Sequence, residues 1–206
     1  MSNYLARHAI YNKKNKLIGY ELLYRNGNTN AYPASVDNDF ATYDLVNSTI
    51  LNSPLSNTTD GKVAFINFTE NCILGKLYEK LNNDDVRNFI IIELLETIKY
   101  KKDLIAHLKK MKKMGFTLAL DDFIYDPSYD KILKYIDVIK LDVKLKQKYC
   151  FKIIKQAAIK ENPNVKFLAE KIESEEEYSY FKGLNFDYFQ GFYFGKPELI
   201  KITDSK

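Results

Sequence analysis

Cysteine and histidine are scarce in this sequence, with two residues of each among 206. Cys72 and Cys150 lie far apart and lack metal-ligand spacing, so we expect free thiols in a reducing compartment. Two histidines, His8 and His107, are too few for a histidine-rich metal site. No apolar run reaches the roughly 20 residues of a membrane span, and the N-terminal residues lack the layout of a secretory signal. These absences predict a cytoplasmic protein without a membrane segment.

Neither sign of charge is in large excess. The 31 basic and 27 acidic side chains leave a net charge of +4, too small and too mixed to indicate binding to a nucleic acid polymer. The densest group of lysines, in residues 107–115, alternates with apolar residues as on the solvated face of a helix. The two clearest loops, residues 26–35 and 52–61, have no independent core on either side. We therefore expect one domain that spans residues 1–206.

Short apolar runs rich in β-branched and aromatic residues predict eight strands. They occupy residues 4–11, 17–24, 63–68, 89–95, 116–120, 137–142, 165–170 and 186–194. Amphipathic, helix-like stretches separate the later runs, at residues 103–115, 129–136, 152–162 and 174–185. This alternation predicts an α/β fold, most simply a closed TIM-like (β/α)8 barrel, with a doubly wound open sheet as the alternative. Because only residues 12–16 separate the first two runs, they form a hairpin, which introduces one antiparallel strand.

A polar or charged side chain lies at or near the C-terminal end of each predicted strand after the first. These residues are Glu21, Asn67, Glu93, Asp121 with Asp122, Lys140, Glu170 and Gln190. Any one of them alone is more simply explained as a helix cap or a solvated turn residue. Seven successive strands with the same feature predict a site, because the C-terminal ends of barrel strands meet at one face.

The donors among these residues indicate the cofactor. Hard oxygen ligands select Mg²⁺ or Mn²⁺ rather than zinc or copper. Five donors suffice for two ions about 3.5–4 Å apart, bridged by Asp121, an arrangement that suits in-line attack on a phosphodiester. Lys140 would add positive charge beside the reacting phosphate or the attacking water. The five expected metal ligands are Glu21, Asn67, Glu93, Asp121 and Asp122.

Seven blocks of the sequence resemble, in order, the signature motifs of the EAL domain, a family of bacterial cyclic di-GMP phosphodiesterases and their non-catalytic relatives. The blocks are YELLYR (20–25), FINF (65–68), IIIELLET (90–97), LALDDF (118–123), DVIKLD (137–142), LAEKIES (168–174) and DYFQGFYFGKP (187–197). The run ARHAI (6–10) is similar to the start of EAL domains that are fused to an HDOD domain. We expect no fused HDOD domain, since the sequence ends at Lys206, and a separate signalling protein is a candidate partner.

The resemblance implies a role for each matching residue. Metal ligands would be Glu21, Asn67, Glu93 and Asp121, with Asp122 at a second ion, and the catalytic residues would be Lys140, Glu170, Asp122 and Gln190. Substrate contacts would come from Arg25, Gln190 and Asp142, and Glu96 would anchor the loop after the two aspartates. The implied reaction, in bacterial second-messenger signalling, is hydrolysis of one phosphodiester of cyclic di-GMP to linear pGpG. The implied assembly is a homodimer that uses the helix after the two aspartates.

The loop after the two aspartates departs from the family pattern. Ile124 stands where the family has a glycine, and Asp126 and Pro127 interrupt the rest of the motif. Glycines let a loop rearrange, whereas proline stiffens it. Two functions therefore remain open: a metal-dependent phosphodiesterase, which the complete donor set favours, and a cyclic di-GMP receptor or protein-interaction module with little turnover, which the loop favours. An unrelated barrel enzyme would require the seven blocks to be coincidental.

Overall fold

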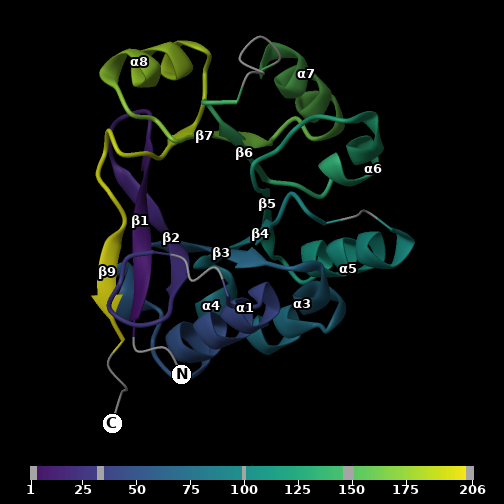
Figure 1. Ribbon diagram of the computed structural model, residues 1–206. Helices are drawn as coiled ribbons and strands as arrows, with labels where there is room; N and C mark the ends of the chain where they lie inside the picture. Colours follow the sequence, from purple (N-terminus) through teal and green to yellow (C-terminus); the bar gives the residue numbers. More distant parts are fainter. Residues whose placement is uncertain (1–3, 32–34, 99–100, 146–150, 203–206) are drawn as a thin grey trace.

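The strands form a closed barrel. The computed structural model describes residues 4–31, 35–98, 101–145 and 151–202 (Figure 1). The strands are β1 (Tyr4–Asn12), β2 (Leu17–Arg25), β3 (Val63–Phe68), β4 (Ile90–Leu94), β5 (Thr117–Leu120), β6 (Val138–Asp142), β7 (Lys166–Glu170), β8 (Tyr188–Phe189) and β9 (Glu198–Lys201). Each strand from β2 to β7 pairs in parallel with the next along the chain, and β1 pairs antiparallel with both β2 and β8. The TIM-like barrel with one antiparallel strand is thus confirmed, and the open-sheet alternative is wrong.

The barrel closes through a short contact. Only Tyr11 and Asn12 of β1 pair with β8, opposite Phe189 and Tyr188. Further along the same edge of β1, residues 4–7 pair with β9, a strand that the sequence pattern did not predict. The predicted strand 186–194 shrinks to β8 because the chain leaves the sheet at Gly191, where φ is +151°. The closing edge of β1 is therefore shared by two short strands.

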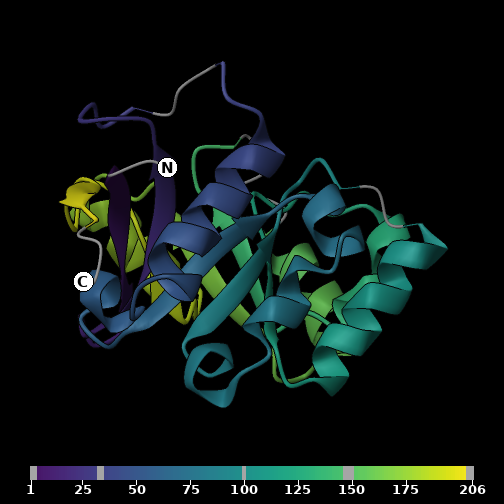
Figure 2. The same ribbon diagram turned by 90° about the horizontal axis from the view of Figure 1, so that it is seen from below.

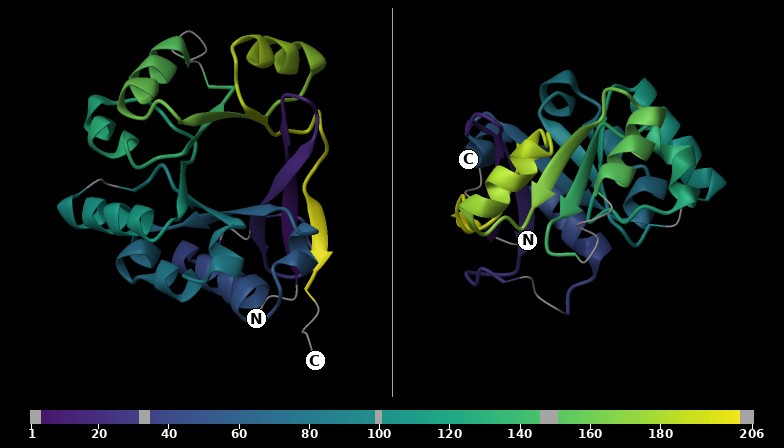
Figure 3. Two further views of the ribbon diagram at one scale, coloured as in Figure 1. Left: turned by 180° about the vertical axis from the view of Figure 1, so that it is seen from behind. Right: turned by 90° about the horizontal axis from the view of Figure 1, so that it is seen from above.

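Helices surround the ring of strands. They are α1 (Asn38–Val46), which continues as a π-helical turn (Asn47–Leu51), α2 (Ser56–Thr59), α3 (Glu70–Leu74), α4 (Asp84–Arg87), α5 (Lys102–Lys113), α6 (Asp130–Leu133), α7 (Phe151–Glu161) and α8 (Glu175–Gly183), with 3₁₀ turns at Leu77–Leu81 and Pro127–Tyr129. From behind, the strands make a ring with these helices outside it, and the view from below shows α1 and α5 along its outer side (Figures 2 and 3). The four predicted helices correspond to α5 to α8. The predicted loop 52–61 was partly wrong, because it contains α2.

The main apolar core lies between the helices and the outer faces of the strands. It includes Phe68, Leu108 and Phe181, each at most 1% exposed. Cys72 is buried in the same core as a free thiol, as expected, while Cys150 lies outside the described residues. Ser174, at the N-terminus of α8, accepts a hydrogen bond from the backbone N–H of Glu177 and so caps that helix. This shell holds the strands in register, and the register determines which side chains meet inside the barrel.

Candidate active site

Inside the barrel, a polar layer lies above an apolar one. Five buried side chains from five strands make the apolar cluster: Ile10, Phe65, Ala119, Val138 and Leu168. Residues two positions apart on a strand point to the same face. Two positions beyond the apolar residue of β3, β5, β6 and β7 come Asn67, Asp121, Lys140 and Glu170. Strand alternation therefore directs these polar side chains to the C-terminal mouth of the barrel.

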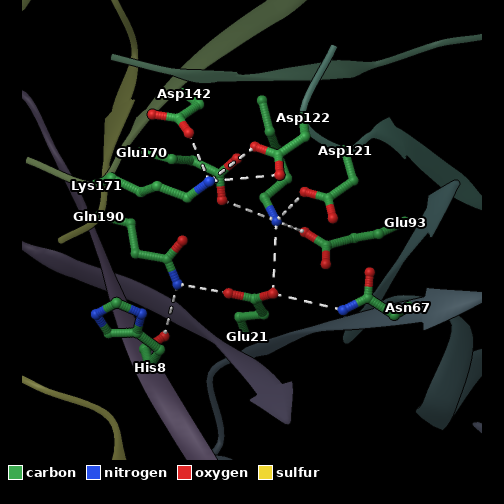
Figure 4. A network of polar contacts seen from close by, with 11 residues as sticks. His8, Glu21, Asn67, Glu93, Asp121, Asp122, Asp142, Glu170, Lys171 and Gln190 are labelled. Atoms are coloured by element: carbon green, nitrogen blue, oxygen red, sulfur yellow. Dashed lines mark hydrogen bonds and ion pairs between the residues drawn. The ribbon is translucent and has the colours of Figure 1, made fainter. Parts of the chain in front are cut away.

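The ammonium of Lys140 lies at the centre of the polar layer. Its Nζ is 2.7 Å from Asp121 Oδ1, 2.8 Å from Glu93 Oε1, 3.0 Å from Glu170 Oε1 and 3.6 Å from Glu21 Oε1. Both Lys140 and Glu93 are completely buried. These four carboxylates come from β2, β4 and β7 and from the end of β5, and they converge on one point (Figure 4). One positive charge thus faces four acidic groups.

Two amide side chains orient Glu21. Gln190 donates from Nε2 to Glu21 Oε2 at 2.9 Å, and Asn67 donates from Nδ2 to Glu21 Oε1 at 3.4 Å (Figure 4). The glycine after Gln190 permits this placement, because a Cβ at Gly191 would lie 2.1 Å from the carbonyl oxygen of Ile172. The close approach of these two chain segments brings Gln190 over the barrel.

The excess of acidic groups shifts their protonation equilibria. Burial raises the pKa of Glu170 to about 8, although the Lys140 ammonium opposes the shift. Burial likewise raises the pKa of Glu93 well above its ordinary value, again against Lys140. For Lys140, burial disfavours the charge, but Asp121, Glu170 and the other carboxylates outweigh it and raise the pKa. These shifts favour the protonated ammonium of Lys140 and make the buried carboxyl groups of Glu93 and Glu170 bind protons more tightly than exposed ones.

The donor set fits a divalent cation in its chemistry. Four buried oxygens have no hydrogen-bond partner: Asn67 Oδ1, both carboxylate oxygens of Glu93 and Glu170 Oε2; of these, Glu93 Oε1 forms an ion pair with Lys140. A buried carboxylate or amide oxygen normally has a partner, and hard oxygens suit Mg²⁺ or Mn²⁺. In the described part of the chain, however, no three His, Cys, Asp or Glu side chains stand in ready metal-binding geometry. The reason is visible in the distances, since the carboxylates turn toward the Lys140 ammonium.

A second ionic cluster lies at the rim. Lys171 Nζ is 2.6 Å from Asp142 Oδ2 and 3.3 Å from Asp122 Oδ1 (Figure 4). Burial and the adjacent Asp121 raise the pKa of Asp122, while Lys171 opposes them. Both Asp122 and Lys171 have left-handed backbone conformations, with φ of +40° and +60°. Asp122 therefore faces Lys171, whereas Asp121 faces Lys140.

Two hollows flank the site. One, of about 370 Å³, is lined by His8, Glu21, Asp121, Asp122, Glu170 and Phe192, among others. The other, of about 250 Å³, is lined by residues that include Leu22, Tyr24, Thr42, Asn67 and Glu96. The contact between Glu21 and Asn67 lies where the two hollows approach each other. Together they have the size of a small-ligand site.

Comparison with known proteins identifies the family. Residues 58–197 match the family model of the EAL domain. The chain belongs to the EAL domain family. It is 35% identical over 206 residues to the cyclic di-GMP phosphodiesterase CdgJ of Vibrio cholerae, covering 97% of this chain and 45% of that protein. It is 36% identical over 210 residues to the uncharacterized protein YuxH of Bacillus subtilis, covering 99% of this chain and 49% of that protein. This EAL domain thus spans about half the length of each relative.

A solved structure supports the same fold. The Bacillus subtilis YkuI protein, which has an EAL domain and was crystallised with its substrate c-di-GMP and calcium, aligns with a TM-score of 0.75. The alignment covers 99% of this chain and 57% of that one, at 18% identity. Within the described residues of this EAL domain, no helix is long and apolar enough to cross a membrane.

Two of the predicted site residues lie outside both ionic clusters. The Arg25 guanidinium is buried at the end of β2, where it donates to Asn30 Oδ1 at 3.0 Å and to the Tyr24 carbonyl at 2.8 Å. Glu96 is exposed and lines a small hollow with residues of the loop after the two aspartates. Phosphate binding by Arg25 and loop anchoring by Glu96 stay predictions.

The loop after the two aspartates is ordered by its own residues. Phe123 is buried and its N–H donates to the Lys140 carbonyl, whereas Ile124 is 47% exposed. Asp126 caps the 3₁₀ turn that begins at Pro127 by accepting from the Ser128 N–H. The side chains that depart from the family pattern thus form a compact turn beside the site.

The sequence patterns missed two residues of the site. Lys171 directly follows Glu170, and a lysine after a strand normally indicates only solvent exposure. His8 lies opposite Glu21 in the β1–β2 pairing and lines the larger hollow. The sequence pattern could have predicted His8. It lies two positions before the buried Ile10, and because β1 runs antiparallel to the other strands, this earlier position points toward the C-terminal mouth of the barrel.

Proposed function

We propose that this EAL domain hydrolyses one phosphodiester of cyclic di-GMP and releases linear pGpG. The observation that carries the proposal is the convergence of Glu21, Glu93, Asp121 and Glu170 at the barrel mouth of a chain in this family. The relative CdgJ is named as a phosphodiesterase for this nucleotide, and YkuI was crystallised with it. Two adjoining hollows also suit a ligand with two bases.

Mg²⁺ or Mn²⁺ is the proposed cofactor, with Glu21, Asn67, Glu93 and Asp121 as its ligands. When bound, such an ion supplies a water of lowered pKa and offsets charge on the phosphate oxygens. The place expected for a second ion, at Asp122, already holds the ammonium of Lys171.

Other residues of the chain would handle the proton and the substrate. Glu170 has a pKa raised to about 8 and a buried oxygen without a hydrogen-bond partner, so its ionised form is suited to accept the proton of the attacking water at mildly alkaline pH. Lys140 holds the carboxylates in place and adds positive charge near the phosphate. Gln190 orients Glu21, and Arg25 and Asp142 are the proposed substrate contacts.

Product analysis tests the proposal. The purified protein, incubated with cyclic di-GMP and Mn²⁺ or Mg²⁺, should release pGpG on chromatography. Glu21→Ala and Asp121→Ala should each lower the rate by about 100-fold or more, since even residues that only support metal ligands contribute 10–100-fold. Glu79→Ala, which removes an exposed acid paired with Lys110 on the outside of the barrel, should leave the rate unchanged. Hydrolysis that survives both site substitutions would refute the metal-ligand assignment.

The compact turn around Ile124 and Pro127 supports a second candidate function. A chain that binds cyclic di-GMP through the same site without turnover would be a receptor or a protein-interaction module. Calorimetric titration with cyclic di-GMP and Ca²⁺ separates the two, because calcium should permit binding but oppose turnover. Saturable binding with no pGpG at high protein concentration in Mn²⁺ would establish the receptor.

We also propose a homodimer through α6 and the preceding turn. The exposed Ile124 and the neighbouring Tyr125 give this surface apolar character. Light scattering after size exclusion should report twice the chain mass, and Ile124→Lys should reduce it to the mass of one chain. An unchanged dimer in the variant would place the interface elsewhere.

A further inference from the structure

The ammonium of Lys171 is held between carboxylates from two other strand ends. Its Nζ lies 2.6 Å from Asp142 Oδ2 and 3.3 and 3.4 Å from the two oxygens of Asp122. Asp122 follows β5, Asp142 ends β6 and Lys171 follows β7, so three neighbouring strands contribute one group each (Figure 4). The cation therefore bridges the rim of the barrel at the aspartate expected to hold a second ion.

The backbone of the two partners is set for this contact. The backbones of Asp122 and Lys171 are both in the left-handed region, with φ of +40° and +60°, a conformation that residues other than glycine rarely adopt. Such conformations persist where the surrounding structure imposes them, and they concentrate at functional sites. A lysine side chain that is half exposed has room to reach solvent, yet here it turns back across the mouth of the barrel.

Charge explains the retention of this lysine. Asp122 adjoins Asp121, and its carboxylate lies 3.3 Å from Lys171 Nζ, so the ammonium offsets the repulsion between the two neighbouring acidic groups. Lys171 Nζ also lies 2.6 Å from Asp142 Oδ2, so one ammonium compensates carboxylates from two strand ends. Lys171 thus supplies the positive charge that a metal ion would otherwise bring to Asp122.

A divalent ion on Asp122 would have to share that carboxylate with the ammonium. Two cations a few ångströms apart repel each other strongly at a partly buried site. We infer that Lys171 is a tethered cation that takes the place of a second divalent ion at Asp122, so that this chain binds one divalent ion rather than two. The inference rests on the proposed metal site formed by Glu21, Asn67, Glu93 and Asp121.

Counting bound metal tests the inference without reference to turnover. Equilibrium dialysis against Mn²⁺, with the bound metal measured by mass spectrometry, should give one ion per wild-type chain and two per Lys171→Met chain. Electron paramagnetic resonance should show the spin coupling of a close Mn²⁺ pair in Lys171→Met alone. Lys171→Arg keeps the charge and should retain one ion.

Lys144→Met is the matched control. This lysine also lies beside the larger hollow, but its Nζ pairs with Glu173 at 3.1 Å and Glu177 at 2.6 Å instead of the two aspartates. Its replacement removes the same charge from the same region and should leave one ion per chain.

Two results would overturn the inference: two ions in the wild-type protein, or equal counts in the wild type and Lys171→Met. Either can occur while cyclic di-GMP is hydrolysed, which would leave the proposed function intact. Conversely, one Mn²⁺ ion per wild-type chain and two per Lys171→Met chain, without any release of pGpG, would support the role of Lys171 and refute the phosphodiesterase. Absence of bound Mn²⁺ from every variant would overturn both.

Discussion

The buried ammonium of Lys140 has four carboxylates between 2.7 and 3.6 Å away, and no solvent reaches it. Removing one partner of a buried ionic cluster leaves the others uncompensated, which typically destabilises a protein by about 3–5 kcal/mol. Lys140→Met should therefore lower the free energy of unfolding by that amount at neutral pH in EDTA. Urea denaturation followed by circular dichroism measures the loss.

A second substitution identifies the cause of that loss. If unpaired carboxylates destabilise Lys140→Met, then adding Glu93→Gln, which removes the most buried of them, should recover part of the stability. Added Mn²⁺ should also recover part of it, because a divalent ion can replace the lost charge. A double variant less stable than Lys140→Met, with no response to Mn²⁺, would show that packing of the lysine stem matters more than its charge.

Individual residues differ in how well the sequence reveals them. Glu93 and Lys140 could be predicted from the sequence because each interrupts or ends an apolar strand, and the period of two fixes which face they share. Lys171 could not be predicted, because its role depends on a left-handed backbone and on carboxylates from two other strands. Nor do strand-end patterns reveal that the carboxylates gather around Lys140, since that arrangement follows from burial and charge in three dimensions.

Among the connecting elements, the turn after β8 depends on a single glycine. At Gly191, φ is +151° and a Cβ would lie 2.1 Å from the Ile172 carbonyl oxygen, so alanine forces the turn to move. Gly191→Ala should lower the free energy of unfolding by at least about 1–3 kcal/mol, the range for an imposed strained conformation. It should also slow pGpG release, because Gln190 loses its position on Glu21. Denaturation and product assays on one preparation measure both.

Gly183→Ala provides the control for that turn. Gly183 ends α8, has no positive φ, and would meet nothing within 4 Å of a Cβ. Alanine there should be neutral or stabilise by up to about 1 kcal/mol, because glycine weakens a helix. Equal effects at the two positions would show that the contact with Ile172 adjusts freely.

Elements with a long periodic pattern were predictable, and short ones were not. The strong amphipathic pattern of 103–115 corresponds to α5, and the apolar run 63–68 corresponds to β3. The strand β9 has only four residues, and its pairing partner lies almost the full length of the chain away. Nothing in the local sequence distinguishes such a segment from a loop, so β9 forms because its backbone pairs with the edge of β1 that β8 leaves free.

At the scale of the whole molecule, closure of the barrel depends on that edge. Between β1 and β8 only two residue pairs join the ends of the sheet, while β9 covers residues 4–7 of β1. Arg7 reinforces the junction: its guanidinium contacts Glu198 of β9, Asp60 and the Thr58 carbonyl, and it stacks over Tyr20 at 4.3 Å. The N-terminal hairpin, the end of α2 and the last strand are thus connected at one point.

Ending the chain at Pro197 should expose this edge. The truncated protein loses the hydrogen bonds of β9 with β1, at about 1 kcal/mol each, and the apolar contact of Ile200, so the free energy of unfolding should fall by about 2–4 kcal/mol. An unpaired edge strand is also a template for association, so sedimentation velocity should show species larger than those of the full chain.

Glu198→Gln is the control for the truncation. It keeps the strand but weakens its partly exposed ion pair with Arg7, and it should lower the free energy of unfolding by less than about 1 kcal/mol without causing association. Equal stability and equal sedimentation of the truncated and full chains would mean that the two pairs between β1 and β8 close the barrel unaided.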